Sequence, residues 1–176
     1  KSLVRHERCL GVISGDECNL WSALRFQQPG PEIYFNKNFP DGIPMENGEL
    51  PDRAKRGMQQ AAKEAELLDL TVPSGKIFIL EHPACQGKGE PYAAPGRELH
   101  STIADTSVLK DAISKHELTS VFTDQCMSGA STRKPTVLLC CPKSKAAAQR
   151  VLGVLICNHD KHEVSLVGVD EEGHFK

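Results

Sequence analysis

The segment KIFIL at residues 76–80 decides the fold class. It is a compact, mostly apolar run rich in β-forming residues, and Gly75 and Pro83 bound it as breakers. A run without polar alternation is typical of an interior parallel strand that is covered on both faces. In open α/β sheets ligands gather beyond the carboxyl ends of such strands, so the residues that follow this run are candidates for a functional site.

Helical and β patterns alternate on both sides of this run, which predicts an α/β domain. Residues 52–70 form the clearest helix, because Pro51 suits a first turn and apolar residues recur at helical spacing. Shorter patterns complete the expected series, with strands at 9–13, 118–123, 135–141 and 163–169 and helices at 106–116 and 144–155. Together they predict a mostly parallel, Rossmann-like sheet with an antiparallel hairpin near the C-terminal end.

Length and charge are those of one ordinary domain. The 176 residues fit a single α/β domain, 1–176, with a proline- and glycine-rich excursion at 27–51. Lys and Arg total 21 and Asp and Glu total 23, so the formal charge of −2 excludes a global basic field for nucleic acid or an anionic membrane. The longest apolar run, 151–157, is far below the ~20 residues of a membrane span, so we expect no such span.

The seven cysteines are distributed in a way that argues against a disulfide framework. Their number is odd, so at least one has no partner within the chain. Three fall within or at the end of expected strands, where a reduced thiol serves as core, and three fall on loops: Cys9, Cys140 and Cys141 belong to the first group, Cys18, Cys85 and Cys126 to the second. This distribution favours a reducing intracellular compartment.

The seventh cysteine begins a cluster with metal-ligand chemistry. Cys157, His159 and His162 follow one another closely, and thiolate and imidazole are the ligands that zinc prefers. Cys140 and Cys141, at the end of the preceding strand, are candidates for the remaining ligand. The alternative is a polar turn between a helix and an edge strand, with Cys157 packed in the core.

One segment of the near-neutral chain is basic. No acidic residue lies between Cys126 and Cys157, whereas this stretch carries five cations: Arg133, Lys134, Lys143, Lys145 and Arg150. Such a patch is a candidate for contacting nucleic-acid phosphates or the acidic face of a protein partner. The alternative is an ordinary solvated face, which the low aromatic content of 5% favours because few rings are present to stack on bases.

Three short motifs resemble the later half of a class I methyltransferase domain. Residues 17–25, ECNLWSALR, resemble the loop that holds a nucleophilic cysteine after a strand, and residues 77–83, IFILEHP, resemble the strand that ends in Glu-Asn-Val or Glu-Asn-Pro. Residues 123–136 resemble the glycine turn and basic residue of the terminal antiparallel hairpin. The order of the motifs matches C5-cytosine DNA methyltransferases and their divergent relatives in retroelement polyproteins.

This resemblance implies roles for three residues. Cys18 would be the thiolate that adds to C6 of a flipped-out cytosine, Glu81 the carboxylate that holds the N3 side of the ring, and Arg133 the positioning cation. The chain departs from the family pattern because Glu17 replaces the proline before the cysteine. No glycine-rich loop precedes Cys18, so the half that would bind S-adenosylmethionine is missing from this sequence.

Three functions are therefore expected, in this order. The first is a degenerate methyltransferase-like domain without a cofactor, acting as a binding or structural component of a larger assembly. The second is an active nucleic-acid methyltransferase fragment that obtains its S-adenosylmethionine site from a missing half. The third is a zinc-stabilised interaction module.

Overall fold

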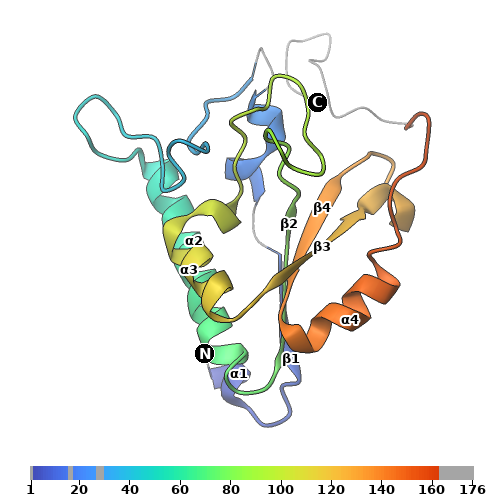
Figure 1. The fold of residues 1–176 in the computed structure, drawn as a ribbon. Helices are drawn as coiled ribbons and strands as arrows, with labels where there is room; N and C mark the ends of the chain where they lie inside the picture. The colour runs from blue at the N-terminus through green and yellow to red at the C-terminus, as the bar shows by residue number, and fades with distance from the viewer. Residues whose placement is uncertain (1, 16–17, 27–29, 163–176) are drawn as a thin grey trace.

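The computed structural model describes residues 2–15, 18–26 and 30–162 as one open sheet with helices on both faces (Figure 1). The strands are β1 (Gly11–Gly15), β2 (Ile77–Pro83), β3 (Thr119–Asp124) and β4 (Pro135–Cys140). The helices are α1 (Ser2–Arg5), α2 (Asp52–Thr71), α3 (Ser107–Lys115) and α4 (Pro142–Val151), joined by the 3-10 turns η1 (Cys18–Trp21), η2 (Ala23–Phe26), η3 (Ile103–Asp105) and η4 (Gln125–Ser128). Among these helices, none is long and apolar enough to cross a bilayer.

The sheet confirms the α/β class and the C-terminal hairpin but not the mostly parallel arrangement. Its strand order is β1-β2-β4-β3, and of the three pairings only β1 with β2 is parallel. A hairpin connection turns β4 back, and β4 then inserts between β2 and β3 instead of extending the sheet outward. Consequently β3 runs in the same direction as β1 and β2 but pairs with neither of them. Hydrophobic periodicity identifies strands but carries no information on their spatial order.

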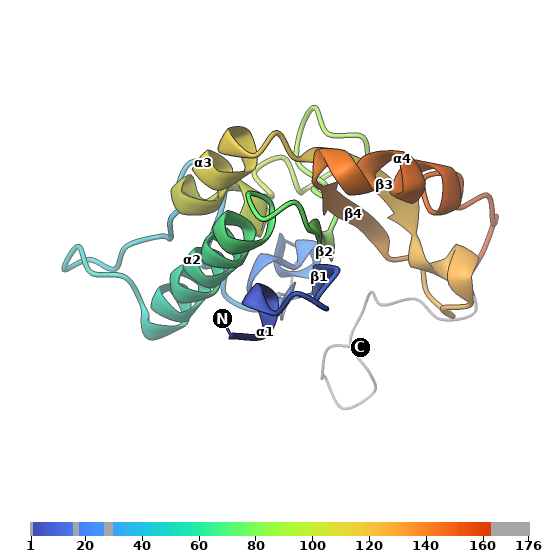
Figure 2. The same ribbon diagram turned by 90° about the horizontal axis from the view of Figure 1, so that it is seen from below.

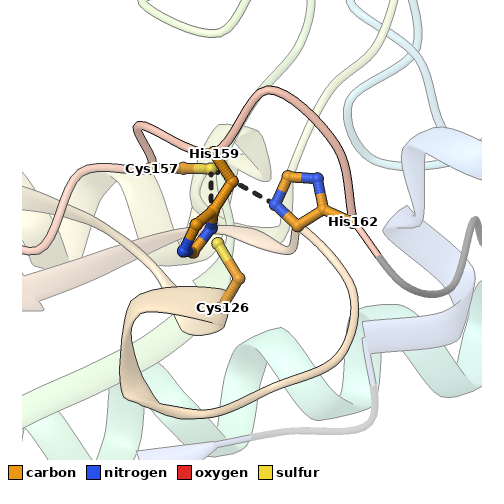
Figure 3. Close-up of side chains that lie close together, drawn as sticks. All are labelled: Cys126, Cys157, His159 and His162. Atoms are coloured by element: carbon orange, nitrogen blue, oxygen red, sulfur yellow. Dashed lines mark hydrogen bonds between the residues drawn. The ribbon is translucent and has the colours of Figure 1, made fainter.

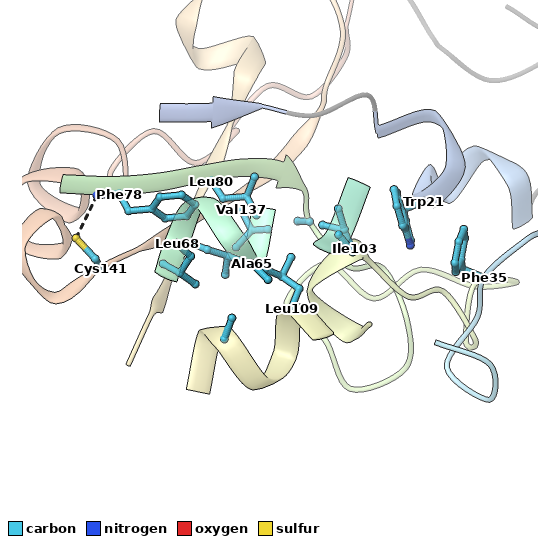
Figure 4. Close-up of a cluster of buried hydrophobic side chains, with 14 of the residues drawn as sticks. Trp21, Phe35, Ala65, Leu68, Phe78, Leu80, Ile103, Leu109, Val137 and Cys141 are labelled. Carbon is cyan, nitrogen blue, oxygen red and sulfur yellow. Dashed lines mark hydrogen bonds between the residues drawn. The ribbon is translucent and has the colours of Figure 1, made fainter. Parts of the chain in front are cut away.

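Successive side chains of the central strands point to opposite faces of the sheet, so the hydrophobic core is divided into two clusters, one on each face. Phe78 and Leu80 of β2 pack with α2 and α3, whereas Ile79 between them joins the cluster under α4. Figure 2 shows α2 and α3 lying side by side, with α4 over β3 and β4. Figure 4 shows the larger cluster, which extends along the sheet to Trp21 and Phe35, whose rings stack with centroids 4.8 Å apart.

Differences from the expected boundaries have local causes. The last helix begins earlier than predicted, at Pro142, because the fixed φ of proline suits the first helical turn. It ends at Val151, two residues before Gly153, so residues 152–155 are not helical. The expected excursion at 27–51 has no helix or strand in its described part, residues 30–51, apart from one bridge between Asn36 and Phe39. The strand expected at 163–169 lies outside the described residues.

Candidate metal centre

Four metal-ligating side chains converge where β3 ends (Figure 3). They are Cys126 of η4 and, from the segment after α4, Cys157, His159 and His162. One sulfur or ring nitrogen from each residue lies within 4.8 Å of all the others. Two sulfur and two imidazole donors are a ligand set that zinc binds in tetrahedral geometry.

The distances within the cluster are close to those of a loaded site. The Sγ of Cys157 lies 3.2 Å from Nε2 of His162 and 3.6 Å from Nδ1 of His159. Around a tetrahedral zinc, with bonds of about 2.0–2.3 Å, neighbouring donor atoms are about 3.3–3.8 Å apart. The two Cys157 separations therefore lie in or near this range, and all four donor atoms lie within 4.8 Å of one another.

The β3–β4 hairpin supplies the first of these ligands. Its connection begins with η4, where Cys126 is buried, and the turn closes at Gly129, whose φ of 95° lies in the left-handed region. The N–H of Ala130 then returns to the carbonyl of Gln125. Glycine adopts this backbone conformation without a Cβ penalty, which fixes the direction in which the turn presents Cys126.

Asp124 holds the second ligand segment against the hairpin. Its backbone N–H donates to the carbonyl of Leu155 at 2.8 Å, and its carboxylate accepts the N–H of Cys157 at 2.9 Å. The same carboxylate, which is completely buried, accepts hydrogen bonds from Tyr92 Oη and Arg133 Nε, both at 3.2 Å. Asp124 therefore orients Cys157 as an outer partner orients a metal ligand.

The environment of the cluster favours a thiolate-binding metal over a hard cation. A cavity of about 320 Å³ adjoins the donors and is lined by Gly129, Ala130, Ser131 and Lys161, and none of its described lining residues carries a carboxylate. Burial raises the pKa of the Cys126 thiol, and its hydrogen bond with Cys157 raises that pKa further. Deprotonation of such a thiol requires a compensating positive charge, which a zinc ion supplies.

The structure brings together the three predicted metal ligands but takes the fourth from elsewhere. Cys140 packs with Val121 and Leu138 in the core under α4, and Cys141 Sγ accepts the N–H of Phe78 at 3.3 Å, so neither joins the cluster. Sequence reasoning missed Cys126 because local spacing identifies ligands within one segment only. Its position beside the glycine turn of an expected hairpin was the available signal.

The residues that the methyltransferase resemblance singled out lie at the same end of the sheet. Glu81 accepts a hydrogen bond from Gln125 Nε2 at 3.1 Å and pairs with Lys134 Nζ at 3.6 Å. Arg133 pairs instead with Asp124. Cys18 begins η1, but its side chain lies outside the described part of the chain.

The predicted basic patch is divided by strand β4. Arg133 and Lys134 precede β4 and are engaged with carboxylates, whereas Lys143 follows β4 and donates to the carbonyl of Gly75 at 2.7 Å. Lys145 and Arg150 are exposed on α4. The five cations therefore lie on both sides of β4 in the chain, and two of them are paired with carboxylates.

The cluster and its surroundings are thus defined by the geometry of this chain alone. Comparisons of the chain with protein-family models, with curated proteins and with solved structures find no match.

Proposed function

We propose that this domain is a zinc-stabilised binding module in which one Zn²⁺ holds residues 153–162 against the β3–β4 hairpin. The observation that carries the proposal is the convergence of two thiols and two imidazoles, from two separate segments, within 4.8 Å. Four protein ligands complete a tetrahedral zinc and leave no position for substrate, which is the arrangement of structural sites. The zinc therefore acts through the fold and not through catalysis.

The weak packing of the second ligand segment supports a structural role for the metal. Val154 is 68% exposed and Ile156 is 44% exposed, so this segment buries little apolar surface of its own. The two hydrogen bonds that join this segment to Asp124 contribute only about 1 kcal/mol for the backbone pair and about 2 kcal/mol for the bond to the carboxylate. A zinc ion that bridges Cys126 to Cys157 supplies the missing attachment and presents the two apolar side chains to a partner.

Metal analysis of the purified protein tests this proposal. We expect one zinc per chain, and the cobalt-substituted protein should show the visible absorption bands of tetrahedral sulfur and nitrogen coordination. Cys126→Ser should lose the metal and those bands. Cys9→Ser is the matched control, because Cys9 is a free thiol outside the cluster, and it should retain both. Full zinc content in Cys126→Ser, or no zinc in the wild type, would contradict the proposal.

A methyltransferase-like component of a larger assembly is the second candidate function. It is favoured by the register of the parallel strands, in which Gly15, three residues before Cys18 in the sequence, pairs with Glu81. A β-carbon built on Gly15 would lie only 3.4 Å from the Glu81 carboxylate. In the degenerate form of this function no activity remains. In the active form a partner chain supplies the S-adenosylmethionine site.

Calorimetric titration with S-adenosylmethionine separates these two forms. We expect no binding by the isolated domain, and a micromolar affinity would contradict the degenerate form. If methyl transfer to a nucleic acid is then detected, Cys18→Ser should abolish it. Activity that survives this substitution would exclude Cys18 as the nucleophile.

A further inference from the structure

A second polar site lies between η1 and the beginning of α2, apart from the residues of the proposed metal centre. A cavity of about 240 Å³ is lined there by Asn19, Leu20, Arg53, Arg56 and Gln60. Its volume is below the roughly 300–1,000 Å³ of typical small-molecule sites, so it suits a small group better than a whole cofactor.

Helix α2 presents three of the lining residues on one face. Arg53, Arg56 and Gln60 are separated by three and four positions, the spacing that places side chains next to one another on a helix. Both arginines belong to the first two turns of this 20-residue helix, where the helix dipole also favours a negative charge. Two guanidinium groups thus line the same cavity.

The two arginines at this cavity are not engaged in ion pairs with described residues. No carboxylate in the described part of the chain forms an ion pair with Arg53 or Arg56. The acidic residues beside them, Glu49 and Asp52, are both within 3.9 Å of the ammonium group of Lys55.

A third arginine, Arg25, is hydrogen-bonded to Asn19, which lines the cavity from η1. Arg25 is only 7% exposed, and its Nε donates to the carbonyl of Asn19 at 2.6 Å. Burial is the main cause that lowers the pKa of this guanidinium; Tyr34 and Glu32 raise that pKa, and the charge of Arg53 lowers it. Arg53 is therefore close enough to Arg25 for the two cations to interact, which places positive charge on both sides of the cavity.

We propose that this cavity binds a phosphate group through the guanidinium groups of Arg53 and Arg56. Guanidinium presents a planar fork of donors that matches phosphate oxygens in bidentate pairs, and charge-assisted bonds of this kind are stronger than neutral ones. The phosphate is either free or part of a nucleic-acid backbone, since both present the same oxyanion. The site adjoins η1, so a phosphate held there lies near the segment that begins with Cys18.

Binding of two probes by the full chain tests the proposal and identifies the source of the phosphate. Inorganic phosphate and a short single-stranded oligonucleotide are titrated calorimetrically at constant ionic strength, with sodium chloride replaced as phosphate is added. For the wild type we expect saturable binding of at least one probe. The double variant R53Q/R56Q should weaken that binding by about tenfold or more, because each lost bidentate pair removes a charge-assisted contact.

Lys63→Gln is the matched control, because Lys63 is an exposed cation on the same helix and does not line the cavity. It should bind both probes like the wild type, and circular dichroism should show that all variants are folded. Binding of inorganic phosphate identifies a free anion as the ligand, whereas binding of the oligonucleotide alone identifies a nucleic-acid backbone. Absence of binding in the wild type, or equal losses in R53Q/R56Q and Lys63→Gln, would overturn the proposal.

Discussion

A single buried histidine illustrates how burial, and not residue type, determines a charge state. His82 of β2 is 1% exposed, its Nδ1 lies 3.1 Å from the carbonyl of Pro83, and its Nε2 has no hydrogen-bond partner among the described residues. Burial lowers its pKa from 6.5 to about 4. The native protein therefore holds this imidazole neutral at pH values where an unfolded chain protonates it.

Acidification should destabilise the domain through His82. Between pH 6.5 and about 4 the unfolded state binds more protons at this residue than the native state, so the free energy of unfolding falls as the pH falls. The full shift corresponds to about 3 kcal/mol. Burial also lowers the pKa of His100, so protonation of the unfolded chain at this residue further reduces the free energy of unfolding at low pH.

Urea unfolding of the wild type and His82→Leu at pH 7 and pH 4.5 measures this contribution. The leucine variant should lose markedly less stability on acidification, and removal of the unpaired Nε2 should leave its stability at pH 7 close to that of the wild type. Equal acid losses in the two proteins would show that His82 is not the responsible group.

Gly57 is a position where local preference and tertiary packing conflict. In an exposed helix interior, replacing glycine by alanine stabilises by about 1 kcal/mol. A β-carbon at Gly57 would lie 2.7 Å from Cζ of Phe35 and 3.1 Å from Cη2 of Trp21, inside a stack of rigid rings. Gly57→Ala should therefore destabilise the protein by about 1 kcal/mol or more, because overpacking outweighs propensity. Urea titration checks this, with the exposed Gln59→Ala as a near-neutral control.

At the scale of elements, Asp124 at the end of β3 links the segments that carry the candidate metal ligands. Asp124 connects β3 to Tyr92 of the long loop, to Arg133 of the hairpin and to Cys157 of the C-terminal segment. No other described carboxylate is completely buried. A buried charge with three partners is costly to disturb, because each partner then loses a strong acceptor.

Asp124→Asn should weaken both the fold and the metal site. Loss of the charged acceptor should cost about 2 kcal/mol of unfolding free energy, and disturbance of a ligand's outer partner should reduce zinc affinity by about tenfold. Arg133→Gln is the informative control, since the Arg133 side chain is 46% exposed and its ion pair is partly solvated. That control should cost under about 1 kcal/mol. Unfolding titrations measure the change in unfolding free energy, and chelator competition measures the change in zinc affinity. Equal losses in Asp124→Asn and Arg133→Gln would contradict this role of Asp124.

Elements with strong local signals were predictable from the sequence. The helix expected at 52–70 is α2, Asp52–Thr71, because its proline start and apolar spacing are local properties. The β2 run was also identified, but the strand continues three residues beyond the predicted end at Leu80 and includes Pro83, which had been expected to bound it. The insertion of β4 between β2 and β3 was not predictable, because strand order depends on side-chain packing between segments distant in the chain.

For the whole molecule, zinc removal should release one end of the chain and leave the rest folded. The core around α2, α3 and the sheet does not include residues 153–162, whereas the contacts of this segment centre on Asp124 and the cysteine and histidine donors. Chelation should therefore increase amide hydrogen exchange in residues 153–162 and around Cys126, while α2 and β2 remain protected. It should also lower the melting temperature, since a ligand that binds only the native state stabilises it. Uniform loss of protection would contradict a local role for the metal.

The sequence by itself determined the α/β class, the positions of most helices and strands, and three candidate metal ligands, because periodicity, breakers and short-range spacing are properties of contiguous residues. Only the tertiary structure decided the strand order, the fourth member of the candidate metal cluster and the pairing of the basic residues. Cys126 meets Cys157 because β3 and β4 form a hairpin and Asp124 binds the returning segment. Arg53 and Arg56 face η1 because Trp21 and Phe35 pack against α2 at Gly57. Each of these contacts joins residues far apart in the chain, where packing and not local preference sets the neighbours.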